Sequence, residues 1–191
     1  MKHLTKLTVA FLMVLLVCGT ARSQSQEEMK AWQDFMTPGD IHKMMAKWDG
    51  KWNEEITMWM QPGAPPQKYN ATCINKMILG GRYQESKHSG NIMGMPFEGI
   101  STTAWDNGRK LFVSTWIDNM GTGIVYMEGA WDGGSKAMTL KGKSTDPMTG
   151  NVMDVREIFT IVDDNTQKLE MFMVAGGSEF KTMEIVFKRA K

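Results

Sequence analysis

The sequence predicts an all-β protein: a closed antiparallel up-and-down barrel of about ten strands with a short N-terminal helical segment. From Gly50 to Arg189 apolar and polar residues alternate with a period of two, which is typical of strands with one buried and one solvated face. Turn-forming sequences punctuate the alternation, and no helix of crossover length interrupts it. Such a series of strands must close on itself or stack, because long exposed edges invite aggregation, and closure is the simplest solution.

The first residues predict a cleavable export signal. Lys2 and Lys6 precede an apolar run from Leu7 to Cys18, and small residues follow at 21–23, where a signal peptidase cuts. The run is shorter than the roughly 20 residues that cross a bilayer, and no later segment is long enough either. We therefore expect a signal peptide at residues 1–23, export to the periplasm or the medium, and no transmembrane segment in the mature chain.

The cysteines and the net charge narrow the class of protein further. Val17 is bulky at the position where a lipoprotein signal needs a small residue, so the sequence favours soluble export over lipidation at Cys18. Removal of the signal leaves Cys73 alone, and no internal disulfide can form. The same removal takes away three cations and no acid, which changes the formal charge from +1 to −2. A chain so close to neutral lacks the broad basic face that nucleic acid requires.

Residues 24–49 are predicted to form the N-terminal helical segment, and residues 50–191 the barrel domain. The helical pattern is in two pieces, interrupted at Pro38–Gly39. In the second piece one face is apolar behind Asp40, the predicted N-cap, and it comprises Ile41, Met44, Met45 and Trp48. We expect this segment to plug or flank one end of the barrel.

The strands follow in order and are joined by short polar turns. The predicted ranges lie near residues 51–60, 68–79, 82–89, 97–105, 110–117, 122–131, 136–143, 151–162, 167–175 and 179–189. The clearest turn sequences between them are Asp106–Gly108, Asp132–Gly134, Asp146–Gly150 and Asp163–Thr166. Three prolines fall together in the loop near residues 62–66, where a missing backbone donor does not weaken a strand ladder.

Several blocks of the chain closely resemble the bacterial domain-of-unknown-function family 1579. The blocks are Trp59–Pro66, Met77–Arg82, Gly94–Gly99, Ser114–Asp118, Asp146–Gly150, Arg156-Glu157 and Lys181–Ile185. The resemblance runs from about Pro38 to Arg189. This family is similar to the calycins, the group of β-barrels that includes lipocalins and fatty-acid-binding proteins. The resemblance therefore implies a calycin-like fold, and it brings no settled activity, cofactor or catalytic residue.

One calycin-like feature can be located in the chain. Gly50, Lys51 and Trp52 open the first predicted strand, as a Gly-x-Trp does in lipocalin-like barrels. In those barrels the indole closes the floor and packs against a basic residue of the last strand. The resemblance implies that Lys188 or Arg189 has this role.

The lumen is the leading candidate site. If Trp52 points inward, alternation places Met58 and Met60 inward as well, and 17 of the 19 methionines remain after signal removal. Methionine adapts to irregular apolar ligands, so we predict a small apolar or lipid-like ligand in the lumen. The predicted binding residues are Trp52, Met58, Met60, Trp116 and Met183 as apolar contacts and Arg156 and Glu184 as polar anchors.

The charges near apolar faces have two interpretations. An arginine such as Arg156, brought near an inward Glu157, Glu170 or Glu184, would bind a ligand carboxylate through its forked donors. The simpler alternative, which we favour, is a structural ion pair or a solvated outer face.

Two other functions remain open. A barrel filled by its own side chains would be a structural or interaction protein of the cell envelope, and its rim loops at Gln61–Pro66, Asn91–Pro96, Asp118–Gly123 and Asp146–Gly150 would dock a partner. A hydrolase or isomerase could use a lumen carboxylate, although the chain has no catalytic motif. We expect no metal and no cofactor, because Cys73, His42 and His88 lack zinc-ligand spacing and haem would depend on His88 alone, beside Met93 and Met95.

Overall fold

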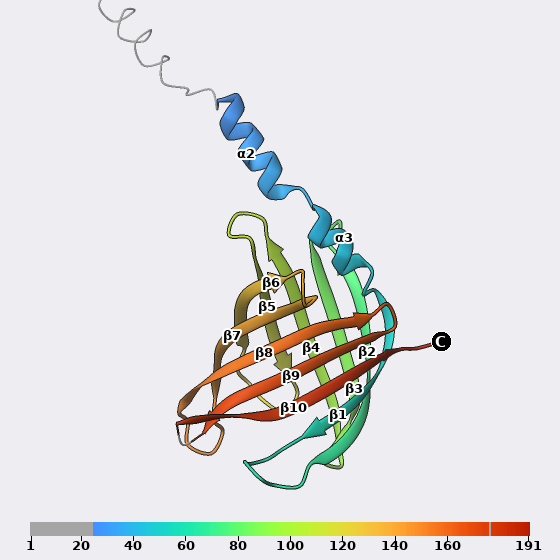
Figure 1. Cartoon of the computed structure of the whole chain (residues 1–191), viewed down its shortest axis with the longest axis vertical. Helices are drawn as coiled ribbons and strands as arrows, with labels where there is room; N and C mark the ends of the chain where they lie inside the picture. The colour runs from blue at the N-terminus through green and yellow to red at the C-terminus, as the bar shows by residue number, and fades with distance from the viewer. Residues whose placement is uncertain (1–24, 176) are drawn as a thin grey trace, which may run out of the picture. The chain divides into compact units, whose positions relative to one another are not determined.

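A computed structural model of the chain describes residues 25–175 and 177–191, and in it ten strands form a closed antiparallel barrel (Figure 1). Each strand pairs with its sequence neighbours, and β1 pairs with β10 to close the barrel. The predicted fold class is confirmed. The predicted signal peptide, residues 1–23, lies outside the described residues. The strands are β1 (Gly50–Met58), β2 (Gln67–Ile78), β3 (Tyr83–Ile92), β4 (Met95–Asp106), β5 (Leu111–Asp118), β6 (Val125–Asp132), β7 (Ala137–Thr145), β8 (Val152–Asp163), β9 (Thr166–Ala175) and β10 (Ser178–Arg189).

Two helices precede the barrel, α2 (Gln26–Met36) and α3 (Asp40–Ala46), with the predicted break between them. Contacts divide the chain between Met36 and Thr37, so α3 belongs to the same compact unit as the barrel and α2 does not. Within the described residues, neither helix has the length and apolar character needed to cross a membrane.

The N-cap of α3 differs from the prediction. Gly39, not Asp40, is the last residue with extended backbone, and its N–H donates to Nδ1 of His42 at 3.0 Å. Asp40 lies in the first turn, where its carboxylate accepts a hydrogen bond from Lys43 Nζ at 2.9 Å. A carboxylate at this place is also favoured by the helix dipole.

The α3 segment closes one end of the barrel (Figure 1). Met45 and Trp48 are buried among lumen side chains, as the predicted apolar face requires. The backbone carbonyls of this segment are satisfied by inward side chains of the barrel. Gln84 Nε2 donates to the carbonyl of Met45 at 2.9 Å, and the carbonyl of Trp48 accepts from Trp52 Nε1 at 2.9 Å and from Asn75 Nδ2 at 3.2 Å.

Arg189 completes the closed end. Its guanidinium lies 4.2 Å from the centre of the Trp52 ring and donates to the carbonyls of Lys47 at 2.7 Å and Asp49 at 2.8 Å. The basic partner that the calycin resemblance implied is therefore Arg189. Lys188 points to the outer face and is exposed.

Two glycines are required by the backbone geometry. The β3–β4 connection is the two-residue turn Met93-Gly94, in which both residues have positive φ, 55° and 81°, as the turn that matches strand twist demands. At Gly129 in β6 a Cβ atom would lie 1.8 Å from the carbonyl oxygen of Thr139. Any side chain at position 129 would force the β6–β7 pair apart.

We predict that Arg189→Met lowers the free energy of unfolding by about 2–4 kcal/mol, because it removes charge-assisted hydrogen bonds to two carbonyls and the contact with Trp52. Lys188→Met, one residue earlier on the outer face, should change it by less than about 0.5 kcal/mol. Chemical denaturation of both variants measures the difference. Equal effects would show that Arg189 does not hold the closed end.

Candidate functional site

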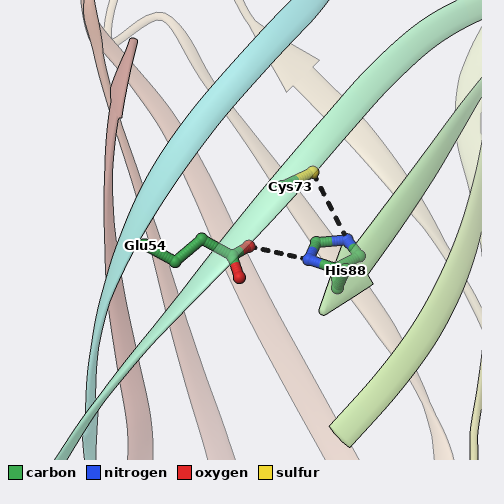
Figure 2. A group of neighbouring side chains, drawn as sticks. All are labelled: Glu54, Cys73 and His88. Atoms are coloured by element: carbon green, nitrogen blue, oxygen red, sulfur yellow. Dashed lines mark hydrogen bonds and ion pairs between the residues drawn. The ribbon is translucent and has the colours of Figure 1, made fainter. Parts of the chain in front are cut away.

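Three side chains converge on the lumen face of β1, β2 and β3 (Figure 2), and we call Glu54, Cys73 and His88 the lumen cluster. Cys73 and His88 are direct cross-strand partners, and Glu54 reaches them from β1. The two ring nitrogens of His88 point in different directions. Nδ1 lies 2.7 Å from Oε1 of Glu54, and Nε2 lies 3.7 Å from Sγ of Cys73.

The cluster is buried and internally hydrogen-bonded. The exposed fractions of Glu54 and Cys73 are 2% and 1%. The thiol of Cys73 donates to Oδ1 of Asn75 at 2.9 Å. Burial raises the pKa of the Cys73 thiol well above its usual range, and the nearby Glu54 charge acts in the same direction. The resting cluster is therefore a protonated thiol, an imidazole and a carboxyl group, and the thiol is a poor nucleophile.

Trp116 packs beside the cluster. Its ring lies edge-on to the imidazole of His88, with the ring centres 5.0 Å apart. Gly99, the cross-strand partner of His88, provides the space, because a Cβ at that position would lie 2.4 Å from the indole. Trp116 Nε1 donates to a carboxylate oxygen of Asp118 at 2.6 Å, which fixes the ring over the cluster.

Glu157 is the second buried acidic group of the lumen. It lies on β8, five strands around the ten-stranded barrel from β3, and thus on the wall opposite His88. Its side chain is only 7% exposed, and burial raises its pKa to about 7. In the described part of the chain no hydrogen bond or ion pair reaches its carboxyl group, whose oxygens keep a little contact with solvent.

The neighbours of Glu157 are apolar. Strand register places it in one continuous row across five strands, a row that we call the methionine row. The row consists of Met58, Met183, Met171, Glu157 and Leu140. Met183 faces inward by alternation with the buried Ile185 and Phe187. A β-bulge in β10 between Lys181 and Met183 then places Lys181 opposite the outward Phe172, although without the bulge Lys181 would share the inward face of Met183.

The lumen is closed at the α3 end and more accessible at the other end. On β9, Gln167 near α3 is 2% exposed, whereas Met171 and Met173 further along are half-buried. On β10, Phe187 near α3 is 5% exposed and Met183 is half-buried. On β9 and β10 the inward side chains therefore gain access to solvent toward the far end, which we call the open rim, whereas Ile92 on β3 and Phe97 on β4 stay buried near that end.

The rim loops predicted from the sequence lie at this open rim. They connect β1 to β2, β3 to β4, β5 to β6 and β7 to β8, and alternate connections of an up-and-down barrel share one end. They expose several large apolar side chains, among them Met60 at 57%, Met93 at 54%, Met120 at 45% and Met148 at 89%.

A separate open hollow of about 430 Å³ is lined by residues of β1, β2 and β3, including Glu54 and Ala71.

The family model described as protein of unknown function (DUF1579) matches residues 37–189, which is most of the chain. This chain belongs to the DUF1579 family. No curated protein matches this DUF1579 member. Among solved structures, the crystal structure of Rv2717c from M. tuberculosis is similar with a TM-score of 0.59 at 12% sequence identity, covering 81% of this chain and 100% of that one. At that identity the likeness supports the barrel fold alone.

Four of the predicted binding residues face the lumen of this DUF1579 barrel. Trp52 and Trp116 adjoin the lumen cluster, and Met58 and Met183 belong to the methionine row. Met60 does not face the lumen. Because β1 ends at Met58, the alternation does not extend to Met60, which is 57% exposed in the β1–β2 loop.

The two predicted polar anchors lie on the outer face, in agreement with the simpler interpretation of these charges. Arg156 forms a bidentate pair with Glu179, at 2.8 and 2.6 Å, and lies 4.0 Å over the ring of Phe172. Glu184 accepts a hydrogen bond from Lys181 Nζ at 2.8 Å. The inward acid of this region is Glu157, the sequence neighbour of Arg156.

The lumen cluster was missed because its members are far apart in sequence. The usual zinc-ligand spacings detect ligands that lie close together in the sequence, on one turn or one hairpin loop, whereas these residues come from three strands. The β2–β3 hairpin could nevertheless have revealed two of them. A hairpin centred on Gly80 and Gly81 places Cys73 directly opposite His88, and this is the register observed.

We predict that stability falls as the pH rises through the range in which Glu157 titrates. The folded state holds the proton to about pH 7, and the unfolded state releases it near pH 4.5. The folded state therefore binds more protons between these values, and about 3 kcal/mol of stability is lost by pH 8.

Denaturation of wild type and Glu157→Gln across pH 4–8 tests this prediction. The variant should lose this part of the pH dependence and be the more stable protein at pH 8. Glu55→Gln on the exposed face of β1 is the matched control and should retain the wild-type slope. A wild-type slope in Glu157→Gln would mean that Glu157 ionises freely.

Proposed function

We propose that the protein is exported and that its lumen binds a small, mostly apolar molecule carrying a hydrogen-bond donor or a positive charge. The observation that carries this proposal is the carboxyl group of Glu157, which lies in the methionine row without a partner among the described residues. A largely buried carboxyl group that no protein donor reaches is poorly solvated, which costs free energy. A ligand that donates to Glu157 would offset this cost.

The charges around the lumen favour a donor ligand over a carboxylate ligand. Within the described chain the buried ionisable side chains are acids, histidine and the Cys73 thiol, and no lysine or arginine is among them. Arg156, a candidate for binding a ligand carboxylate, is engaged by Glu179 on the outer face. A fatty-acid anion would meet Glu54 and Glu157 with no cation to balance it.

The apolar side chains that line the lumen favour a ligand that is mostly apolar. Met58 and Met183 of the methionine row and Trp116 pack against the same cluster of buried apolar side chains, and all three are half-buried. Methionine side chains rearrange at low cost, so they suit a ligand of irregular shape. The open rim offers the route into the lumen.

Native mass spectrometry of the purified protein, before and after organic extraction, tests the carrier hypothesis. We expect a reproducible excess mass that extraction removes, and a higher melting temperature of the extracted protein with an apolar amine than with the carboxylate of equal chain length. Glu157→Gln should weaken amine binding by about tenfold or more, since it loses a charge-assisted contact.

Glu55→Gln serves as the control and should bind the amine as wild type does. A bare mass together with no melting shift for either ligand would refute the carrier hypothesis. A preference for the carboxylate would refute the assigned role of Glu157.

The open rim supports a second candidate, an interaction protein of the cell envelope. Exposed methionines on four loops make the rim apolar, and apolar patches of this kind often mark contact surfaces. The two candidate functions predict that different variants lose binding. Replacing Met93 and Met148 by Gln should abolish partner binding in this second case and leave the mass excess of the lumen unchanged.

Export rests on the N-terminal sequence, where two lysines precede the apolar run and small residues follow it. We predict that the protein recovered from the envelope or the medium begins at Gln24. N-terminal sequencing or intact mass measures this directly. A recovered chain that retains residues 1–23 in the cytoplasm would refute export.

A further inference from the structure

We propose that Cys73 and His88 bind a divalent transition-metal ion of borderline softness, Zn²⁺, and that Glu54 positions the imidazole. The three side chains come from adjacent strands, and their candidate ligand atoms all lie within 4.8 Å of one another. Figure 2 shows dashed lines from one ring nitrogen of His88 to the carboxylate of Glu54 and from the other to the sulfur of Cys73. This site is separate from Glu157, which lies on the opposite wall.

The distance between the two donor atoms fits one metal ion. Zn–S and Zn–N bonds of about 2.3 and 2.05 Å at a tetrahedral angle hold sulfur and nitrogen about 3.6 Å apart. Sγ of Cys73 and Nε2 of His88 are 3.7 Å apart. The two residues are direct cross-strand partners in the β2–β3 ladder, so the backbone fixes this separation.

Glu54 selects the nitrogen that binds. Its Oε1 lies 2.7 Å from Nδ1 of His88, and a carboxylate at that distance accepts the Nδ1–H. The lone pair of the neutral ring then lies on Nε2, the nitrogen on the side of Cys73. A carboxylate that orients a metal-binding histidine in this way is a common outer partner of zinc sites.

Charge and hardness point to the class of ion. Thiolate and imidazole together suit zinc, copper and cobalt better than calcium or magnesium, which prefer oxygen ligands. The deprotonated thiol and the Glu54 carboxylate carry two negative charges, which a divalent cation balances in this buried place. On binding, the S–H bond of Cys73 is replaced by an S–Zn bond, and one proton is released to solvent.

Cys73 and His88 supply only two of the ligands that a zinc ion needs, so positions on the ion would remain open toward the lumen. Zinc takes four ligands, and sites with open positions complete the set with water or a bound molecule. His88 and Trp116 face the lumen together, so water or a lumen ligand would occupy the remaining positions.

The test uses the purified, reduced and chelator-treated protein with Zn²⁺ alone for calorimetry and Co²⁺ alone for spectroscopy. We expect one ion per chain, release of one proton measured in buffers of different ionisation enthalpy, and a thiolate-to-cobalt charge-transfer band in the near ultraviolet. The absence of this band in folded wild-type protein overturns the proposal without reference to any variant.

Variants of Cys73, His88 and Glu54 test whether these residues form the Zn²⁺ site. Cys73→Ser and His88→Gln should each lose the stoichiometric site, and Glu54→Gln should weaken Zn²⁺ binding by about 10- to 100-fold, the usual effect of losing an outer partner. Glu55→Gln, the outward neighbour of Glu54, is the matched control. Circular dichroism and melting curves confirm that each variant is folded, and Cys73→Ala replaces Cys73→Ser if the latter unfolds.

Binding that persists unchanged in Cys73→Ser and His88→Gln would place the ion on the surface and overturn the assignment. The outcome is independent of the carrier hypothesis, because Glu157→Gln should bind Zn²⁺ as wild type does.

Discussion

The closed end of the barrel depends on how the backbone carbonyls at the end of α3 and in the segment after it are satisfied. These carbonyls enter an apolar lumen, where an unpaired acceptor would cost about 1–3 kcal/mol. Side chains from four strands supply the donors: Trp52, Asn75, Gln84 and Arg189. The residues that stabilise the plug are therefore residues of the lumen wall, and one of them, Trp52, belongs to the same apolar cluster as Cys73. Three of the four donors and all three residues of the lumen cluster come from β1, β2 and β3.

The local features of the fold could be predicted because they rest on local rules. Alternation and turn residues located every strand within a few residues, and the apolar face of α3 was visible in the helical spacing. The predictions failed at element ends, where one backbone angle decides the outcome. Asp40 has the chemistry of an N-cap, yet the backbone of Gly39 is the last in the extended region. Met60 continues the alternation in the sequence, but the strand has already ended at Met58.

The site was harder to predict because it depends on registers and on burial. The registers of the β1–β2 and β2–β3 hairpins determine which residues of these three strands meet. A shift of one residue would turn His88 outward. The bulge in β10 has no signal in the sequence, although it decides that Lys181 faces outward while Met183, two residues later, faces inward. The sequence places Arg156 and Glu157 on opposite faces, but it does not say which face is the lumen. Only the apolar surroundings of Glu157 in three dimensions raise its pKa to about 7.

The pairing of β1 with β10 has a consequence for the order in which the chain can fold. These two strands join residues 52–58 to residues 183–189, which are the most distant parts of the barrel sequence. Every other ladder is a local hairpin that can form as soon as its two strands exist. The closing ladder must instead wait for the last strand and bear the loop-closure entropy of the whole barrel. Until then the first strand presents an open edge, so a nascent or truncated chain is a sheet with two unpaired borders, and completion of the C-terminus is what converts it into a barrel.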